Sequence, residues 1–314
     1  MEQIDSGKMT YTDKISCSAN ASDMGGSQIW FKEGEELTVN DALKAIAVVS
    51  ANDVCVAVSE HIGGSQENFA KMMNEKAKEL GMENTNFMNC HGIDEEGHYT
   101  TAKDIAIMSR ELITKHPDIL KYTSIWMDSL RDGTFELSST NKLIRYYEGA
   151  TGLKTGFTSS AGYNLSGTAT RNGTSYIAVV MKAPSSEVRL AEIKQLLDYG
   201  FATYQVQSLC DKDTVVDSKM INKNVNDVVD IVIKDNVTSL LEKGSKIETE
   251  QVIKYDEELI APIMSNSKVG TIEIIDKSTK EIIGTSDLIV KVDIAKSNFM
   301  EYFKQLFKMF ILRG

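Results

Sequence analysis

The chain has 314 residues, of which 42% are hydrophobic and 25% charged, as expected for a folded protein with one large domain and a smaller one. Its formal net charge of -11 repels polyphosphate, and no basic run is interleaved with aromatic residues, so we expect no nucleic-acid partner. The cysteines lack C-x-x-C spacing and are few, so we predict no disulfide framework; they are Cys17, Cys55, Cys90 and Cys210. The histidines lack the spacing of metal ligands, so we predict no metal, and we also expect no cofactor; the histidines are His61, His91, His98 and His116.

Amphipathic stretches predict a mainly helical first part of the chain. Asn40 or Asp41 can cap a helix that runs through Ala47, and Ser65 opens a helix that ends at Gly81. Between them, residues 54–62 form an apolar stretch that ends at two glycines. Thr101, with Asp104 three residues later, starts a further helix.

The periodicity then changes to that of strands. Residues 163–169 and 175–181 flank Asn172-Gly173, a pair that favours a tight hairpin turn. A helix carrying Ile193 and Leu197 follows, and we expect it to pack on the sheet. The first domain, residues 1–204, is therefore predicted to be an α+β domain of helices around an antiparallel sheet.

Short Val/Ile-rich runs beyond residue 205 predict a small β-sandwich over residues 205–294. These runs cover residues 214–216, 228–233, 247–253, 269–275, 281–283 and 287–292.

Residues 295–314 predict an amphipathic helix with an aromatic face. Four basic residues stand against the single acidic Glu301, which suits an anionic membrane surface. The alternative is a terminal helix docked on the protein's own core. The apolar face consists of Phe299, Tyr302, Phe303, Leu306, Phe307 and Phe310.

Ser50 and Asn52 are the first candidate functional residues. At a spacing of two they do not share a face of an α-helix, so both reach one cleft only if the chain breaks between two helices. One helical pattern ends near Val49 and another begins at Asn52 or Asp53, which permits such a break. The alternative is a Ser or Asn that caps the second helix.

Lys154-Thr155-Gly156 is the second candidate element, on a predicted strand ahead of the hairpin. Lys154 would place a cation at the cleft for a substrate carboxylate, and Gly156 would let an extended peptide approach the strand edge. The N–H of Phe157 is a candidate oxyanion donor. The alternative is a lysine on a solvated strand end.

In this order, Ser50-Ala51-Asn52 and Lys154-Thr155-Gly156 resemble the second and third motifs of penicillin-binding serine enzymes. The flanking residues resemble the D-alanyl-D-alanine carboxypeptidases of the low-molecular-weight penicillin-binding class, whose β-rich domain and amphipathic tail also match. These flanks include residues 34–39, 74–82, 84–87, 91–92, 149–152 and 161–165.

The resemblance implies a penicillin-binding fold and removal of the terminal D-alanine from peptidoglycan stem peptides ending in D-Ala-D-Ala, through a serine acyl-enzyme that β-lactams also form. By position, Ser50 would pass a proton toward the departing D-alanine, and Asn52 would bind the substrate amide. Lys154, Thr155 and Gly156 would bind the end of the peptide, and Phe157 N–H would supply half of the oxyanion hole. The protein would act outside the cell, on the outer face of the cytoplasmic membrane.

The Ser-x-x-Lys motif that carries the family's nucleophile is not found at its expected place before residue 50. Two loose matches, Ser139 to Lys142 and Ser265 to Lys268, lie out of order and are rejected. Because Met1 to Asp5 also lacks the pattern of an export signal, we expect an N-terminally truncated and inactive form. The competing hypotheses are a non-catalytic peptidoglycan-binding or scaffold protein and a β-lactamase.

Overall fold

The computed structural model describes residues 1–224, 228–256 and 258–311, with the side chains of residues 305, 306 and 308–311 outside the description. The chain forms two compact units, Met1–Ala202 and Thr203–Gly314. Each unit has its own hydrophobic core and is described by itself.

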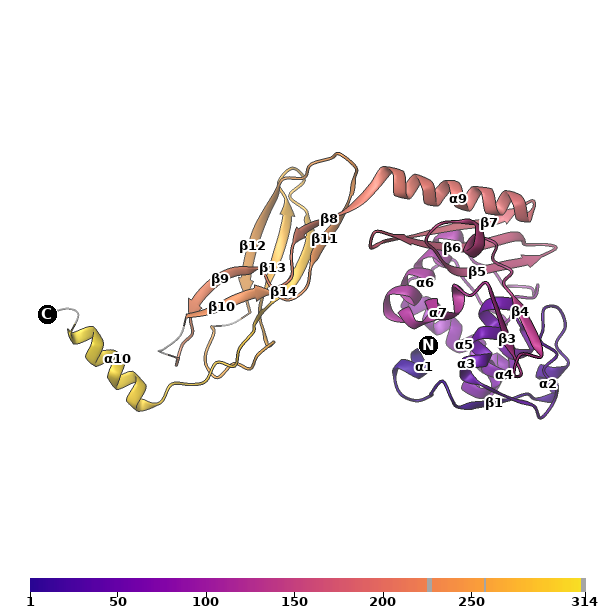
Figure 1. Cartoon of the computed structure of the whole chain (residues 1–314), viewed down its shortest axis with the longest axis horizontal. Helices are drawn as coiled ribbons and strands as arrows, with labels where there is room; N and C mark the ends of the chain where they lie inside the picture. Colours follow the sequence, from indigo (N-terminus) through magenta and orange to yellow (C-terminus); the bar gives the residue numbers. More distant parts are fainter. Residues whose placement is uncertain (225–227, 257, 312–314) are drawn as a thin grey trace. The chain divides into compact units, whose positions relative to one another are not determined.

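The sheet of the first unit has the antiparallel order β5-β6-β7, from β5 (Ala150–Thr158), β6 (Gly162–Arg171) and β7 (Thr174–Ala183). The predicted hairpin is confirmed: Asn172 and Gly173 join β6 to β7 with φ of 50° and 77°, a left-handed geometry that Asn and Gly tolerate best. Helix α9 (Ser186–Thr203) lies along one face of this sheet (Figure 1). Its Ile193 and Leu197 are fully buried there, as predicted.

The main helices of this unit follow the predicted stretches. They are α3 (Val39–Lys44), the π-helix η1 (Ala45–Val49), α4 (Asn52–Gly63), α5 (Gln66–Glu79) and α6 (Ala102–Lys115). Ser65 and Thr101 cap α5 and α6 as predicted, since each hydroxyl accepts a backbone N–H three residues later.

The predicted cap of α3 was wrong. Thr38, rather than Asn40 or Asp41, holds the N-cap position, with its Oγ1 accepting from Asp41 N at 3.0 Å. The Thr38 hydroxyl also donates to the Asp41 carboxylate at 2.8 Å, so the two residues form a reciprocal cap in which Asp41 is the third helical residue.

Short elements connect these parts and complete the first core. They are α1 (Glu2–Asp5), β1 (Lys14–Ser16), α2 (Ala19–Ser22), β2 (Glu36–Thr38), η2 (Pro117–Ile119), α7 (Leu120–Thr123), β3 (Met127–Leu130), β4 (Phe135–Ser138) and α8 (Leu143–Tyr146). Strands β1 and β2 pair with each other, as do β3 and β4.

The second unit contains two sheets, ordered β12-β13-β14-β10-β9 and β11-β8, around one apolar core. Its strands are β8 (Tyr204–Cys210), β9 (Val215–Met220), β10 (Val228–Ile233), β11 (Val237–Glu242), β12 (Thr249–Tyr255), β13 (Lys268–Asp276) and β14 (Ile282–Val290). The predicted β-rich domain is confirmed, but β8 and β11 were missed. Most side chains of β8 are exposed, and β11 has a single fully buried residue, Val237, so neither strand has the Val/Ile-rich run on which the prediction relied.

Strand β14 also corrects a prediction, since two separate runs were expected where one strand crosses Gly284. A Cβ on Gly284 would stand 2.3 Å from Cγ1 of Val237. This glycine therefore allows β11 to pass close by rather than making a turn.

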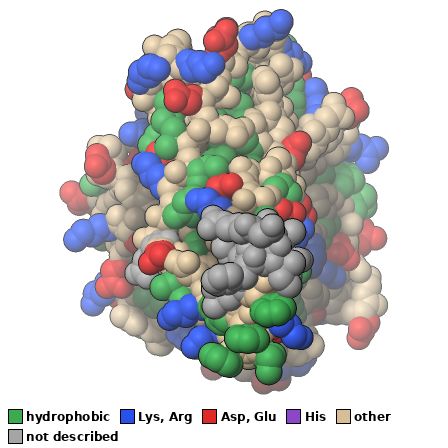
Figure 2. Space-filling model, turned by 90° about the vertical axis from the view of Figure 1, so that its left-hand side faces the viewer, with side chains coloured by type: hydrophobic (Ala, Val, Ile, Leu, Met, Phe, Trp, Pro, Cys, Tyr) green, Lys and Arg blue, Asp and Glu red, His purple; other side chains and the backbone are tan. Residues whose placement is uncertain are grey.

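Helix α10 (Phe299–Ile311) ends the described chain. Phe299, Phe303 and Phe307 lie on one face and are 82%, 55% and 61% exposed. Figure 2 shows hydrophobic side chains gathered beside basic side chains at this end of the chain. The predicted aromatic face also included Leu306 and Phe310, whose side chains lie outside the description. Among the described residues, no helix has the length and apolar character to cross a bilayer.

Replacing Ile193 by alanine should lower the free energy of unfolding of the first unit by about 2–5 kcal/mol, because the buried side chain fills the space above Gly167. Trp30 and Trp126 are the chain's two tryptophans, so their fluorescence during urea unfolding reports this unit alone. Leu196→Ala on the same helix is the control, and its side chain is exposed. Equal effects of both substitutions would contradict the packing of α9 on the sheet.

Candidate active site

A break between η1 and α4 brings Ser50 and Asn52 to one cavity. Ser50 is left-handed, with φ of 63°, and Ala51 is extended before α4 begins at Asn52. Both residues line a cavity of about 730 Å³, which Lys154, Thr155, Gly156 and Phe157 line from the side of β5. The structure thus places all six predicted site residues around one hollow.

Asn52 is held in place by residues 25–27. Its backbone N–H donates to Ser27 O at 2.7 Å, and its side-chain Nδ2 donates to Gly25 O at 2.9 Å. Gly26 passes so close that a Cβ there would lie 2.7 Å from Asn52 Nδ2. Because a carbonyl oxygen can only accept, these contacts fix which side of the amide carries the N–H groups.

Lys154 is a partly buried cation with no ion-pair partner among the described residues. Its Nζ donates to Thr155 O at 2.9 Å. Burial lowers the pKa of Lys154 to about 8, with Cys55 opposing the shift and the positive charge of Arg189 adding to it.

Thr155 and Phe157 extend the same strand edge. Thr155 Oγ1 is hydrogen-bonded to Thr140 Oγ1 at 2.7 Å, and Thr140 N donates to Val48 O at 3.2 Å, which ties β5 to the end of η1. Phe157 is 57% exposed, and its ring centroid lies 4.4 Å from that of Tyr163.

Arg189 is a site residue that the sequence analysis missed. It comes from the first turns of α9 and lines the same cavity, 7% exposed. Its Nη1 donates to Asn164 O at 3.3 Å, while its buried Nε has no partner. The available signal was its position four residues before Ile193, on the apolar stripe of α9, where an arginine is unusual.

Residues 89–93 and His98 form a further wall of the cavity. Asn89 closes this loop by accepting from Gly92 N at 2.7 Å and donating to Ile93 O at 3.0 Å. Cys90 and His91 do not pair: Cys90 Sγ donates to Gln66 Oε1, and His91 Nδ1 accepts from Ile93 N. Burial raises the pKa of Cys90 and lowers that of His91.

Neither Ser-x-x-Lys match lines this cavity in the described part of the chain. Ser139 is buried, and its hydroxyl accepts from Asn141 N at 3.2 Å. Ser265 and Lys268 lie in the second unit. Within residues 1–224, 228–256 and 258–311, no cluster of three or more His, Cys, Asp or Glu side chains could hold a metal ion.

This fold is that of the penicillin-binding enzymes, and comparison with known proteins identifies the family. Residues 1–185 match the family model of D-alanyl-D-alanine carboxypeptidase, and residues 204–296 match the model of the C-terminal domain of penicillin-binding protein 5. The chain therefore belongs to the D-alanyl-D-alanine carboxypeptidase family. Enzymes of this family process D-Ala-D-Ala ends of peptidoglycan outside the cytoplasm and are inhibited by β-lactams.

The chain is similar to named relatives over most of its length. It is 38% identical to the D-alanyl-D-alanine carboxypeptidase DacF of Bacillus subtilis over 97% of this chain and 79% of that protein. The structure of penicillin-binding protein 5 from Haemophilus influenzae matches with a TM-score of 0.72 and 27% identity, over 94% of this chain and 86% of that one. Penicillin-binding protein D2 from Listeria monocytogenes, in its cefotaxime-bound form, matches with a TM-score of 0.58 and 33% identity, over 64% and 81% of the two chains.

The rate at which acetic anhydride acetylates the Lys154 amine should rise with pH and reach half its maximum near pH 8, rather than near the ordinary lysine pKa of 10.5. The reason is that burial disfavours the charged form of the amine. Mass spectrometry of peptides acetylated across a pH series measures this midpoint. Arg189→Met removes a neighbouring positive charge and should move the midpoint upward. A wild-type midpoint at the ordinary lysine value would contradict the buried environment of Lys154.

Proposed function

We propose that the cavity binds the D-Ala-D-Ala end of a stem peptide, with the terminal carboxylate against Lys154, Thr155 and Arg189. The observation that carries this proposal is the pair of cations in one hollow: among the described residues neither Lys154 nor Arg189 forms an ion pair. A buried charge without a partner is costly, and an anionic ligand offsets that cost.

The other site residues have roles along the bound peptide. Asn52 hydrogen-bonds the substrate amide, and Ser50 is placed where it would pass a proton toward the departing D-alanine once the family's nucleophilic serine is present. Phe157 N–H contributes to the oxyanion hole. Gly156 keeps the edge of β5 open to an extended peptide. Among the described residues, a Cβ there would meet only Asn164 Cβ, at 4.0 Å, so packing within this part of the chain does not demand glycine.

The acyl-enzyme of this family requires the serine of Ser-x-x-Lys. Because neither match to that motif lines the cavity in the described residues, we propose that the present chain binds the dipeptide end without becoming acylated.

Lys154→Met and Arg189→Met should each lower the affinity for an N-acyl-D-Ala-D-Ala peptide by roughly tenfold or more, since each removes a charge-assisted contact to the carboxylate. Isothermal titration calorimetry at pH 7 measures this affinity. Lys194→Met, a lysine of α9 outside the cavity, is the control.

Unchanged binding by both variants would refute the carboxylate site. Fluorescent penicillin tests acylation separately, because only a covalent adduct survives on a denaturing gel. A labelled band from this chain would overturn the proposal of binding without acylation.

We also propose that α10 attaches the protein to the outer face of the cytoplasmic membrane. Phe299, Phe303 and Phe307 are exposed and stack along one face, with ring centroids 6.5 and 6.4 Å apart. The exposed Lys304 supplies positive charge beside them, and the sequence is locally basic on an otherwise acidic chain. An aromatic face beside basic residues suits the boundary between head groups and acyl chains of an anionic membrane.

Phe303→Glu should reduce binding to vesicles of phosphatidylglycerol and phosphatidylcholine by roughly tenfold, because it removes buried apolar area and adds a negative charge. Co-sedimentation of the full chain measures the bound fraction. Met264→Glu is the control, since that methionine is also exposed but lies outside α10. Equal losses in both variants would show that binding depends on overall charge rather than on the helix.

A further inference from the structure

The segment Gly25–Phe31 lies beneath Asn52 and is held there by hydrogen bonds from several residues. Besides its two contacts to Asn52, it donates to the fully buried carboxylate of Asp53 from Ile29 N at 3.1 Å and from Phe31 N at 3.0 Å. Asp53 follows Asn52 directly, so the segment and the start of α4 are held to each other at two successive residues.

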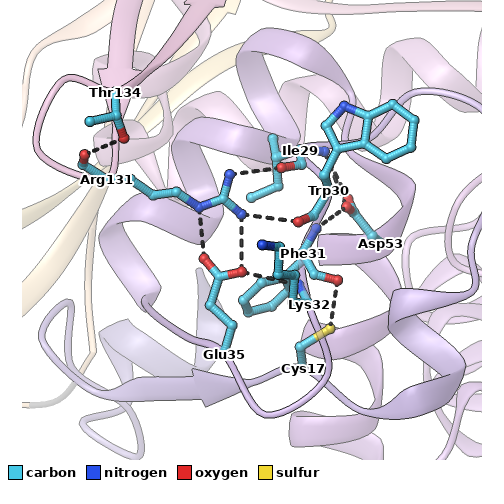
Figure 3. Close-up of polar contacts among 9 residues, drawn as sticks. All are labelled: Cys17, Ile29, Trp30, Phe31, Lys32, Glu35, Asp53, Arg131 and Thr134. Carbon is cyan, nitrogen blue, oxygen red and sulfur yellow. Dashed lines mark hydrogen bonds and ion pairs between the residues drawn. The ribbon is translucent and has the colours of Figure 1, made fainter.

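Arg131 holds the same segment from the other side. It belongs to the turn between β3 and β4, and its guanidinium donates to Ile29 O at 2.9 Å and to Trp30 O at 3.2 Å. The same group pairs with Glu35 through Nε at 2.7 Å and Nη2 at 3.1 Å. Figure 3 shows the Ile29–Phe31 backbone between Arg131 and Asp53. A planar guanidinium can make these contacts together, whereas a lysine ammonium cannot.

We call the contacts of Arg131 and Asp53 to residues 29–31 the clamp. The backbone is strained on both sides of it. Trp30, Arg131 and Asp132 are left-handed non-glycine residues, with φ of 58°, 52° and 54°. Such conformations persist only where surrounding contacts enforce them, and they are concentrated at functional sites. Trp30 remains 66% exposed, so burial of its ring does not explain why its backbone is held there.

The clamp determines what Asn52 presents to the cavity. With Nδ2 donating to Gly25 O, Oδ1 has no hydrogen-bond partner among the described residues and is available as an acceptor. If the segment moved away, the amide could rotate and present donors instead. We propose that Arg131, together with Glu35, is a positioning residue for Asn52: acting through Gly25–Phe31, it keeps Oδ1 turned to the substrate. This role rests on the binding function proposed above.

Arg131→Met in the full chain should lower the affinity for an N-acyl-D-Ala-D-Ala peptide by about fivefold or more, because Asn52 no longer holds one orientation. The NMR signals of the Asn52 side-chain amide should shift, and their hydrogen exchange should become at least about tenfold faster. Arg145→Met is the matched control, since Arg145 stacks on Trp126 and Tyr146 in the same unit. It should change neither readout.

The exchanged pair Glu35→Arg with Arg131→Glu separates positioning from stability. It can restore the ion pair, but a carboxylate at position 131 cannot donate to the carbonyls of Ile29 and Trp30. We expect the urea midpoint to recover while the Asn52 amide signals and the affinity do not. Arg131→Lys, which keeps a single donor nitrogen in place of the three of the guanidinium, should be intermediate and serves if Arg131→Met does not fold.

Two results would overturn the proposal. One is an Arg131→Met variant with wild-type Asn52 amide signals and affinity; the other is recovery of both readouts in the exchanged pair. If the wild-type chain does not bind the peptide, the proposed function fails, but the Asn52 amide signals still test the positioning on their own.

Discussion

The left-handed turn at Ser50 is the constraint on which the site depends. A continuous helix would turn Ser50 and Asn52 to different faces, so one of them would leave the cavity. A left-handed non-glycine residue costs about 1–2 kcal/mol, and contacts from three directions hold it. Thr140 N binds the last turn of η1, Ala51 N donates to Ala45 O, and Asn52 N donates to Ser27 O.

The charges around the cavity favour an anionic ligand. The chain is acidic as a whole, yet this hollow concentrates Lys154 and Arg189 without carboxylate partners among the described residues. The lowered pKa of Lys154 reflects the cost of keeping its charge away from water. A site that is costly when empty and favourable when occupied by an anion is suited to binding, because the ligand recovers free energy that folding gave up.

The candidate site and helix α10 lie in different units of the chain. Every candidate site residue lies in the first unit, on a helix break, a strand edge and the start of α9. The second unit encloses its own core and carries α10. This separation agrees with the two family models that match the chain in succession. The further subdivision at residues 295–314 stays a prediction.

Several elements of this protein could be predicted from its sequence because they depend on interactions between residues that are close together in the chain. The caps at Ser65 and Thr101, the Asn172-Gly173 hairpin and the strand carrying Lys154-Thr155-Gly156 depend on neighbouring residues, whose hydrogen bonds and turn preferences act over three or four positions. The order of the motifs then identified the family. Only the tertiary structure decided that Arg189 joins Lys154 and that Arg131 holds the segment beneath Asn52. Arg189 lies 35 positions after Lys154 (189 − 154), and Arg131 lies 102 positions from Ile29. No short-range preference encodes which distant side chains packing will bring together.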